Sequence, residues 1–337
     1  MEPRALLEAL IDRRDLAPEQ AAALMRHLTS GEAPDAQIGG FLVALRAKGV
    51  TSSELAAFAQ VLRERAAALT HEHKDLVDTC GTGGGRPSFN ISTAAAIVAA
   101  SAGARIAKHG NRGVTSACGS ADVLEALEVN IQLPIERQTQ VLNEAGIVFM
   151  FAPAHHPAMR HVGPARKALG LRTVFNQLGP LANPAGARRQ LIGVYEQAMV
   201  RPMAEALVRL GVERALVVHG EDGLDEISPS KPTRYAKVVG GQLTEGRWTP
   251  GDFGLKELSE AHLDPGESVA ANAAILREAI SVASSPRSAA VLPSAAAALW
   301  LAGLVEDLPR GARMAREAIA TGAAARKLQQ LAGLTKL

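Results

Sequence analysis

Aromatic side chains are scarce in this sequence. Phe, Trp and Tyr together make up 3% of the 337 residues, although hydrophobic residues make up 47%. The interior must therefore be packed mainly by Ala, Leu, Val and Ile, which favours helices in close contact. A chain of this length is long enough for about two domains, or for one large domain with a smaller one attached.

Cysteine is almost absent. The two cysteines, Cys80 and Cys118, do not make a disulfide framework, and they lack the C-x-x-C spacing of a structural zinc site. We therefore expect a cytoplasmic protein in a reducing environment.

A charge excess of one sign and long hydrophobic runs are also missing. Lys and Arg number 36, Asp and Glu number 34, and no dense basic run occurs, so we expect no nucleic-acid partner. The N-terminal segment carries charges among its leucines and lacks the apolar core of a signal peptide. The nearly apolar stretch 94–104 is shorter than the roughly 18 residues of a membrane span, so we expect no membrane association.

Residues 1–70 are predicted to be wholly helical. Leu6 and Leu10 fall on one apolar stripe, and Pro18 suits the first turn of a second helix. Thr51 and Glu54 have the spacing of a capping box at the start of a fourth helix. This small helical domain has no visible chemistry of its own, which suggests a role in packing or dimerisation.

From Leu76 onward, short β-branched runs alternate with helical stretches, and this alternation predicts a mostly parallel sheet. The fold class is therefore α/β: a small all-helical N-terminal subdomain, and a large domain, 71–337, with a mostly parallel central sheet flanked by helices. The predicted strands are 76–78, 105–107, 148–151, 191–194 and 215–219. A hairpin is expected around 238–241, and helices are expected at 272–283, at 295–304 and from Arg313 onward.

The glycine-rich stretch from Val77 to Thr93 follows the first predicted strand. Glycines let the backbone approach an anion, and the N–H groups at the start of the next helix favour negative charge. Asn90, Ser92 and Thr93 can cap that helix or reach a ligand. The stretch is either a phosphate cradle or an ordinary strand-to-helix turn.

Two further polar loops follow predicted strands, at the edge of the sheet where ligands collect. Residues 108–122 combine cations, an amide, hydroxyls and glycines, although Lys108 taken alone could be a solvated surface lysine. Asp225 and Glu226 lie in an acidic loop and could supply oxygens to Mg²⁺, or belong to a solvated acidic turn. Beside a phosphate cradle, the metal interpretation is favoured.

The segment from His155 to Leu169 is predicted to be helical, with a kink at Gly163-Pro164. Its histidines cannot share one helical face, which disfavours a zinc site. Its arginines include Arg166, and an arginine here could bind a carboxylate through two hydrogen bonds.

Several motifs in order resemble the anthranilate phosphoribosyltransferases of tryptophan biosynthesis. They are FNIST at 89–93, KHGNRGVTS at 108–116, GSADVLEAL at 119–127, HHPAMRHVGPARKALGLRTVFNQLGPLANPA at 155–185 and GLDEIS at 223–228. The likeness covers nearly the whole chain. It implies the nucleoside phosphorylase and phosphoribosyltransferase-like fold, a homodimer formed through the helical domain, and helices of about 155–185 joining that domain.

The resemblance also implies the residues of the site. The phosphoribosyl diphosphate would be held by Gly81, Thr82, Gly84, Gly85, Ser88, Asn90, Ser92, Thr93, Lys108, Ser116 and Ser120. Anthranilate would be bound by Gly81, His109, Gly110, Asn111 and Arg166, and the Mg²⁺ cofactor by Ser92, Asp225 and Glu226.

The glycine loop departs from the family pattern GTGGDG. Here it reads GTGGG followed by Arg86-Pro87-Ser88, which is one residue shorter and has Gly85 in the apparent place of the aspartate. Arg86 is a candidate for direct contact with phosphate. Glu128 stands where the family usually has glycine.

The reaction implied is displacement of diphosphate from the anomeric carbon of the ribose by the amine of anthranilate. An aryl amine is already neutral and nucleophilic near neutral pH, so no general acid or base is assigned. Two alternatives share the architecture: a pyrimidine nucleoside phosphorylase, and a non-catalytic relative that binds nucleic acid. The KHGN and GPLANP segments disfavour the first, and the balanced charge disfavours the second.

Overall fold

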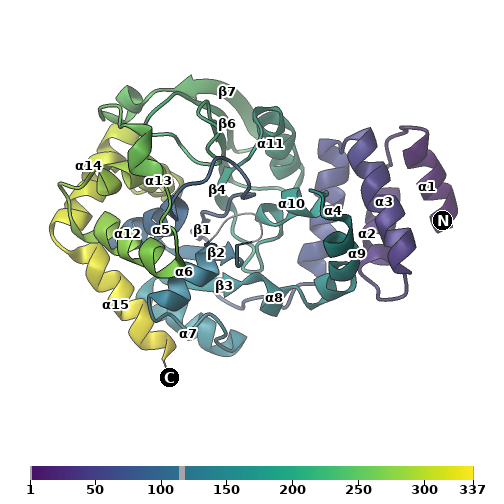
Figure 1. Cartoon of the computed structure of the whole chain (residues 1–337), viewed down its shortest axis with the longest axis horizontal. Coiled ribbons are helices and arrows are strands. Elements are labelled where there is room, and N and C mark those ends of the chain that lie inside the picture. The colour runs from purple at the N-terminus through teal and green to yellow at the C-terminus, as the bar shows by residue number, and fades with distance from the viewer. Residues whose placement is uncertain (1, 114–117, 337) are drawn as a thin grey trace.

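The computed structural model describes residues 2–113 and 118–336, and Figure 1 shows a small helical body beside a larger body built around a sheet. Four helices form the small body: α1 (Pro3–Ile11), α2 (Pro18–Leu28), α3 (Asp35–Lys48) and α4 (Ser52–Glu64). Helix α2 begins at Pro18 and α4 directly after Thr51, as the sequence predicts. Thr51 and Glu54 form the expected capping box, because the Thr51 side chain accepts from the Glu54 N–H and the Glu54 carboxylate accepts from the Thr51 N–H.

Glu54 is also a buried anchor of the small body. Its Oε1 accepts a hydrogen bond of 2.9 Å from the Leu16 N–H, and its Oε2 lies 2.9 Å from Nζ of Lys48. The side chains of Glu54 and Lys48 are almost fully buried, so each charge is compensated by the other and not by hydration. One carboxylate thereby joins α3, α4 and the loop before α2.

A seven-stranded sheet forms the centre of the large body, in the order β3-β2-β1-β4-β5-β6-β7. Strands β1 to β5 pair in parallel, and β6 and β7 form an antiparallel hairpin. The strands are β1 (Val77–Asp78), β2 (Ile106–Gly110), β3 (Ile147–Phe151), β4 (Arg189–Gly193), β5 (Arg214–Gly220), β6 (Thr233–Val239) and β7 (Gln242–Trp248). The mostly parallel sheet is confirmed, and the carboxyl ends of β1, β2 and β5 carry the three polar loops.

The alanine-rich core covers one face of the sheet. Helix α5 (Ile91–Ser101) is buried along most of its length and packs against α13 (Pro286–Ala302) and α15 (Ala323–Thr335). On α14 (Leu308–Ala320), a Cβ added at Gly311 would lie 3.0 Å from Cβ of Ala296. Small side chains let these helices approach closely, as the shortage of aromatics predicts.

Three boundary predictions near the C-terminus and in the middle of the chain are wrong. The final helix is two helices, α14 and α15, because Gly322 between them adopts a left-handed conformation with φ of 72°. Helix α13 starts at Pro286 and continues through Pro293, whereas the sequence predicts a start at 295. The segment 155–169 forms separate short pieces, and Gly163-Pro164 begins a new helix where a kink is predicted.

The remaining helices connect these layers. They are α6 (Ser120–Ala126), α7 (Ile135–Ala145), α8 (Ala152–His155), η1 (Pro157–His161), α9 (Gly163–Leu169), α10 (Phe175–Leu178), η2 (Pro180–Ala182), η3 (Gln197–Met199), α11 (Val200–Arg209), η4 (Pro250–Phe253), η5 (Glu260–Leu263) and α12 (Val269–Ser281). Side chains of α9, α10, η2 and α11 share a buried core with the small body. Within 2–113 and 118–336, no helix has the length and apolar composition that crossing a bilayer requires.

Candidate active site

One cleft, with a volume of about 410 Å³, brings the polar loops together. Its lining includes every site residue predicted from the sequence within the described ranges: Gly81, Thr82, Gly84, Gly85, Ser88, Asn90, Ser92, Thr93, Lys108, His109, Gly110, Asn111, Ser120, Arg166, Asp225 and Glu226. Ser116 lies outside the described residues. Residues far apart in the sequence thus meet at the carboxyl ends of the parallel strands, where ligands of open α/β sheets bind.

The glycine loop lies directly on the acidic loop. The Arg86 N–H donates to the carbonyl of Gly223 at 2.7 Å, and a Cβ added at Gly85 would lie 2.7 Å from Oδ1 of Asp225. Since that distance is shorter than any real Cβ contact, only glycine fits at position 85. The neighbouring Asp225 and Gly223 therefore leave no room for an aspartate side chain at position 85.

Glu226 caps helix α5. Its Oε1 accepts a hydrogen bond of 2.9 Å from the Ser92 N–H, and its Oε2 accepts one of 3.4 Å from Oγ of Ser294. The predicted cap by Asn90 is wrong, because the Asn90 amide instead donates to the Cys118 carbonyl at 3.1 Å. The carboxylate of Glu226, in the loop after β5, caps the N-terminus of α5 instead.

The electrostatics of Asp225 and Glu226 suit a cation. Burial raises the pKa of Asp225, and burial together with the neighbouring Asp225 raises the pKa of Glu226 to about 7. Two adjacent carboxylates with restricted access to water repel one another, and a cation bound between them relieves this repulsion. The oxygen donors of Asp225, Glu226 and Ser92 match the hard ligands that Mg²⁺ prefers.

Histidine and cysteine do not add to this donor set. Within 2–113 and 118–336, no group of three or more His, Cys, Asp or Glu side chains is arranged to hold a metal ion. Glu221 in the same loop is paired with Arg234 and Arg247, and Asp222 accepts from Oγ of Ser228. Further ligands of a magnesium ion would therefore have to be water and substrate oxygens.

Lys108 is a buried cation rather than a surface lysine. It is 4% exposed, and its Nζ donates to the Thr79 carbonyl at 2.8 Å and to Oγ of Ser92 at 3.4 Å. Asp78 is a second buried charged group near Lys108. Burial raises the pKa of Asp78 to about 6, although a 2.7 Å hydrogen bond from Asn183 lowers this pKa in part. Lys108 is thus held at the end of the cleft that carries the acidic pair.

Two neutral histidines lie in contact where strand β2 meets the 155–185 segment: His109 lines the cleft, and His156 packs against it. The ring centroids of His109 and His156 are 5.1 Å apart, and Nδ1 of His109 lies 3.1 Å from the carbonyl of Gly179. Burial lowers the pKa of His109 to about 3 and that of His156 to about 4. His155 faces elsewhere and lies between the Ala67 carbonyl and Gln138. The His109 ring thus gives this part of the cleft a neutral, aromatic surface.

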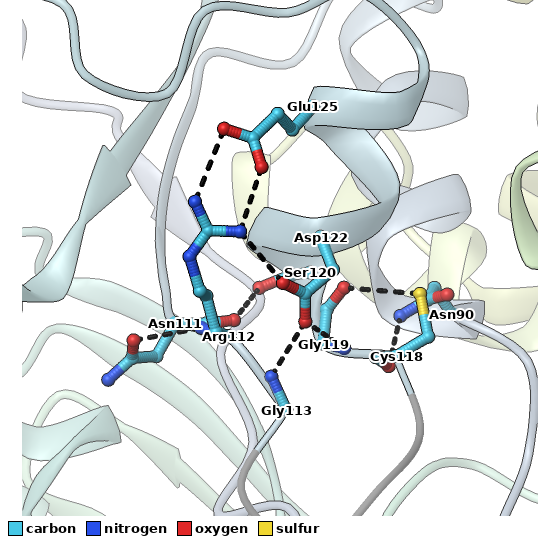
Figure 2. A network of polar contacts seen from close by, with 9 residues as sticks. All are labelled: Asn90, Asn111, Arg112, Gly113, Cys118, Gly119, Ser120, Asp122 and Glu125. Carbon is cyan, nitrogen blue, oxygen red and sulfur yellow. Dashed lines mark hydrogen bonds and ion pairs between the residues drawn. The ribbon is translucent and has the colours of Figure 1, made fainter. Parts of the chain in front are cut away.

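The carboxylate of Asp122 joins the backbone that follows Asn111 to the backbone that precedes Ser120 (Figure 2). Asp122 Oδ2 accepts hydrogen bonds of 2.9 Å from the N–H groups of both Gly113 and Gly119, while its Oδ1 lies 2.9 Å from Nη1 of Arg112. A Cβ added at Gly119 would lie 2.3 Å from the Gly113 nitrogen, so the two backbones touch. We call these contacts the Asp122 clasp.

Arg166 on α9 is a cation without an acidic partner. Among the described residues, no hydrogen bond or ion pair engages its guanidinium, which lies 5.3 Å from the centroid of the Phe175 ring. Burial lowers its pKa, since a charged group loses hydration there. An anion bound in the cleft would compensate this charge.

Sequence reasoning missed several lining residues, among them Arg172, Phe175, Asn176 and Pro180. No strand end or glycine-rich turn marks them in the sequence, because they reach the cleft through the path of the α9–α10 segment. The candidate role of Arg86 in phosphate contact is not supported by its position. Its guanidinium is paired with Glu260 and Asp264.

The domain families agree with this architecture. The family described as "Glycosyl transferase family, helical bundle domain" matches residues 4–66, and "Glycosyl transferase family, a/b domain" matches residues 73–325. The fold and cleft thus define a glycosyl transferase of the two-domain, helical bundle and α/β class.

Relatives that match over the full length of the chain identify the family more specifically. The chain is 46% identical to an anthranilate phosphoribosyltransferase of Saccharophagus degradans over all of both chains. A crystal structure of the Thermus thermophilus enzyme of that name matches with a TM-score of 0.92 and 41% identity, covering 98% of this chain and 99% of that one. The Saccharomyces cerevisiae enzyme in complex with PRPP and Mg matches with a TM-score of 0.89 and 26% identity, covering 99% of this chain and 98% of that one. The chain belongs to the anthranilate phosphoribosyltransferase family.

Proposed function

We propose that this chain transfers the phosphoribosyl group of 5-phosphoribosyl 1-diphosphate to the amine of anthranilate, in tryptophan biosynthesis. The observation that carries this proposal is that two chemically different groups of residues line one cleft. One group is the glycine loop with Lys108 and the acidic pair, and the other is the unpaired Arg166 beside Phe175. The first group suits a metal-bound diphosphate and the second an aromatic carboxylate, so we assign them to a donor end and an acceptor end of the cleft.

The donor end would hold the phosphoribosyl diphosphate. Backbone N–H groups of the glycine loop and of the start of α5 donate to anions, and Lys108 adds a fixed positive charge. The other assigned donor ligands are Gly81, Thr82, Gly84, Gly85, Ser88, Asn90, Ser92, Thr93 and Ser120. Ser116 remains assigned by resemblance alone.

Asp225, Glu226 and Ser92 would hold Mg²⁺. The relative from yeast carries Mg together with PRPP, which supports the same use here. When bound, the ion would neutralise the acidic pair and the charge that develops on the departing diphosphate.

The acceptor end would hold anthranilate. Arg166 offers a planar pair of donors that match a carboxylate, and Asn111 offers both a donor and an acceptor for the amine side. His109, Gly110 and Gly81 complete the wall. Because His109 is neutral, it adds no charge that would compete with Arg166 for the carboxylate.

The domain division proposed for this chain is a helical unit of residues 1–70 with helices from about 155–185, and an α/β unit of 71–337. The shared core of α4, α9, α10 and η2 supports the inclusion of the second segment. The substrates would then meet between the two units, with the acceptor on the helical side.

A homodimer through the helical domain is proposed from its apolar surface. Ile11, Val43 and Leu171 are 65%, 45% and 53% exposed, and they lie on α1, on α3 and just after α9, which pack on one another. A Val43→Arg variant that sediments as a monomer would support this interface.

A cytoplasmic location is proposed from the cysteine usage of the sequence. The chain has only two cysteines, Cys80 and Cys118, and they do not make a disulfide framework.

The direct test mixes the protein with anthranilate, 5-phosphoribosyl 1-diphosphate and Mg²⁺ and follows the loss of anthranilate fluorescence. We expect turnover that requires all three components. An Arg166→Gln variant should raise the KM for anthranilate by about tenfold to a hundredfold, because charge-assisted hydrogen bonds to its carboxylate are lost. Activity on thymidine with phosphate, and none on anthranilate, would contradict the proposal.

A further inference from the structure

Five cationic side chains line the cleft, and three of them are committed to partners within the protein. Arg86 is paired with Glu260 and Asp264, and Arg112 with Asp122 and Glu125. Lys108 is also engaged, through the Thr79 and Ser92 contacts described above. Within the described ranges, Lys108, Arg166 and Arg172 are the cleft cations that form no ion pair with a carboxylate, and Arg166 and Arg172 are the two arginines among them.

Arg172 is held over the glycine loop. Its Nη2 donates to the carbonyl of Gly84 at 2.6 Å, and its guanidinium lies 4.2 Å from the centroid of the Tyr195 ring. A Cβ added at Gly84 would lie 3.0 Å from this Nη2, so the two groups are in direct contact. The Arg172 carbonyl also accepts a hydrogen bond from Arg46 of α3, which ties this backbone to the helical domain.

The donors of Arg172 are only partly used. A guanidinium carries five N–H groups, and among the described residues the Gly84 carbonyl is the one hydrogen-bond acceptor that this guanidinium meets. Burial raises the pKa of Asp225, and the charge of Arg172 is among the smaller influences that lower it. The geometry places the cation near that carboxylate, because Gly84, which Arg172 contacts, adjoins Gly85, where an added Cβ would lie 2.7 Å from Oδ1 of Asp225.

We propose that Arg172 is a ligand of the diphosphate group of the phosphoribosyl donor. It would donate its free N–H groups to diphosphate oxygens beside the glycine loop. The assignment rests on the proposed function. The two unpaired arginines then serve the two anionic groups of the reaction, Arg166 the carboxylate of the acceptor and Arg172 the leaving group of the donor.

This contact would act in the transfer step. The bond between the anomeric carbon and the diphosphate oxygen breaks, and its electron pair goes to that oxygen. The amine nitrogen forms the new bond to the anomeric carbon and releases one proton to water. Negative charge grows on the diphosphate during bond breaking, so a guanidinium already fixed in place stabilises the transition state without reorganisation.

The test measures binding of inorganic diphosphate with Mg²⁺ by titration calorimetry, with ribose 5-phosphate as a second probe. We expect Arg172→Gln to weaken diphosphate binding by about tenfold to a hundredfold, the range for a lost charge-assisted hydrogen bond. Binding of ribose 5-phosphate and the KM for anthranilate should stay within about threefold of wild type, a change under 1 kcal/mol. Arg172→Lys should keep part of the affinity for diphosphate, because lysine keeps the positive charge but lacks the planar pair of N–H donors of a guanidinium.

Arg166→Gln is the matched control, with the opposite pattern: a raised KM for anthranilate and unchanged diphosphate affinity. Unchanged diphosphate binding in both Arg172 variants would overturn the assignment, as would a loss that falls on ribose 5-phosphate instead. If Arg172→Gln lowers the thermal midpoint and weakens all ligands alike, Arg172 only supports the loop, and the proposal is also overturned. A wild-type chain that binds diphosphate but consumes no anthranilate would contradict the proposed function, while the Arg172 titrations would still decide this role.

Discussion

Glu226 accepts a hydrogen bond from the backbone N–H of Ser92 at 2.9 Å, so the loop after β5 caps the helix that follows β1. This contact joins two sides of the cleft that are separated in sequence by more than a hundred residues. It also places the acidic pair at a helix N-terminus, where the helix dipole favours negative charge. The candidate metal site and the proposed phosphate cradle thus share the Glu226–Ser92 contact at the N-terminus of α5.

The double variant Asp225→Asn with Glu226→Gln removes the charges proposed to hold Mg²⁺. We expect at least about a hundredfold lower kcat/KM at a Mg²⁺ concentration that saturates the wild type, since metal stabilisation of a leaving group is worth several kcal/mol. Glu221→Gln is the control, because that carboxylate lies in the same loop but is paired with Arg234 and Arg247. Magnesium titrations of steady-state activity check the result, and an unaltered Mg²⁺ dependence would refute the metal assignment.

Removal of the Asp122 clasp should misplace Asn111 and Ser120 together. Asp122→Ala leaves the Gly113 and Gly119 N–H groups without their acceptor, and we expect kcat/KM to fall by about tenfold to a hundredfold. Asp122→Asn keeps an oxygen that can accept both bonds, so its loss should be smaller. Glu125 pairs with Arg112 and does not bind the Gly113 or Gly119 N–H group. Glu125→Gln should therefore leave kcat/KM within about threefold of the wild type, as expected for the loss of an exposed ion pair. Equal effects of Ala and Asn would argue against the clasp.

Gly85→Ala tests the contact between the glycine loop and Asp225. The new Cβ would lie 2.7 Å from both the nitrogen and Oδ1 of Asp225, so either the loop or the carboxylate must move. A displacement of about 1 Å in a reacting site can lower the rate by about a hundredfold, and we expect that order of loss. The control is Gly333→Ala, in α15, where no heavy atom lies within 4 Å of an added Cβ. Wild-type kinetics in Gly85→Ala would contradict the close packing.

Glu128→Gly should stabilise the protein. Glu128 has a φ of 68°, and the left-handed region costs a non-glycine residue about 1–2 kcal/mol. Its ion pair with Lys336 is exposed, so water and salt screen it and it adds little to stability. We expect a gain of about 1 kcal/mol in urea unfolding. Glu128→Gln, which removes the ion pair and keeps the backbone conformation, should change stability by less than about 0.5 kcal/mol, and a gain there instead would point to charge rather than strain.

The buried histidine pair predicts acid sensitivity. The pKa of His109 is lowered to about 3 and that of His156 to about 4, so below pH 6.5 the unfolded state binds more protons than the folded state. Stability is therefore lost as pH falls from 6.5 towards 4, by about 1.4 kcal/mol per histidine and pH unit. Buried Asp78 and Glu226, with raised pKa values, act in the opposite direction.

The comparison with His156→Gln isolates the histidine contribution. Between pH 7 and pH 5, urea unfolding of the wild type should lose about 2 kcal/mol more than that of the variant. Parallel curves for the two proteins would show that His156 is not held neutral.

Much of the architecture could be predicted from local pattern. Apolar periodicity and the Thr51 capping box located the four N-terminal helices, and β-branched runs located the five parallel strands. Helix ends were less predictable where one residue decides them, as at Gly322, or where tertiary burial overrides propensity, as in α13 with Pro293 inside it. The polar loops were predictable because they follow strands.

The sequence by itself determined the α/β class, the family and a set of polar residues that could serve a phosphoribosyl donor and an aromatic acceptor. Those conclusions depend on residue types and their order along the chain. Only the tertiary structure decided how the cations are used: Arg86 is paired with Glu260 and Asp264, while Arg172 reaches the glycine loop unpaired. The physical reason is that a charge is available to a ligand only if no nearby protein group compensates it, and such neighbours are set by the folded chain.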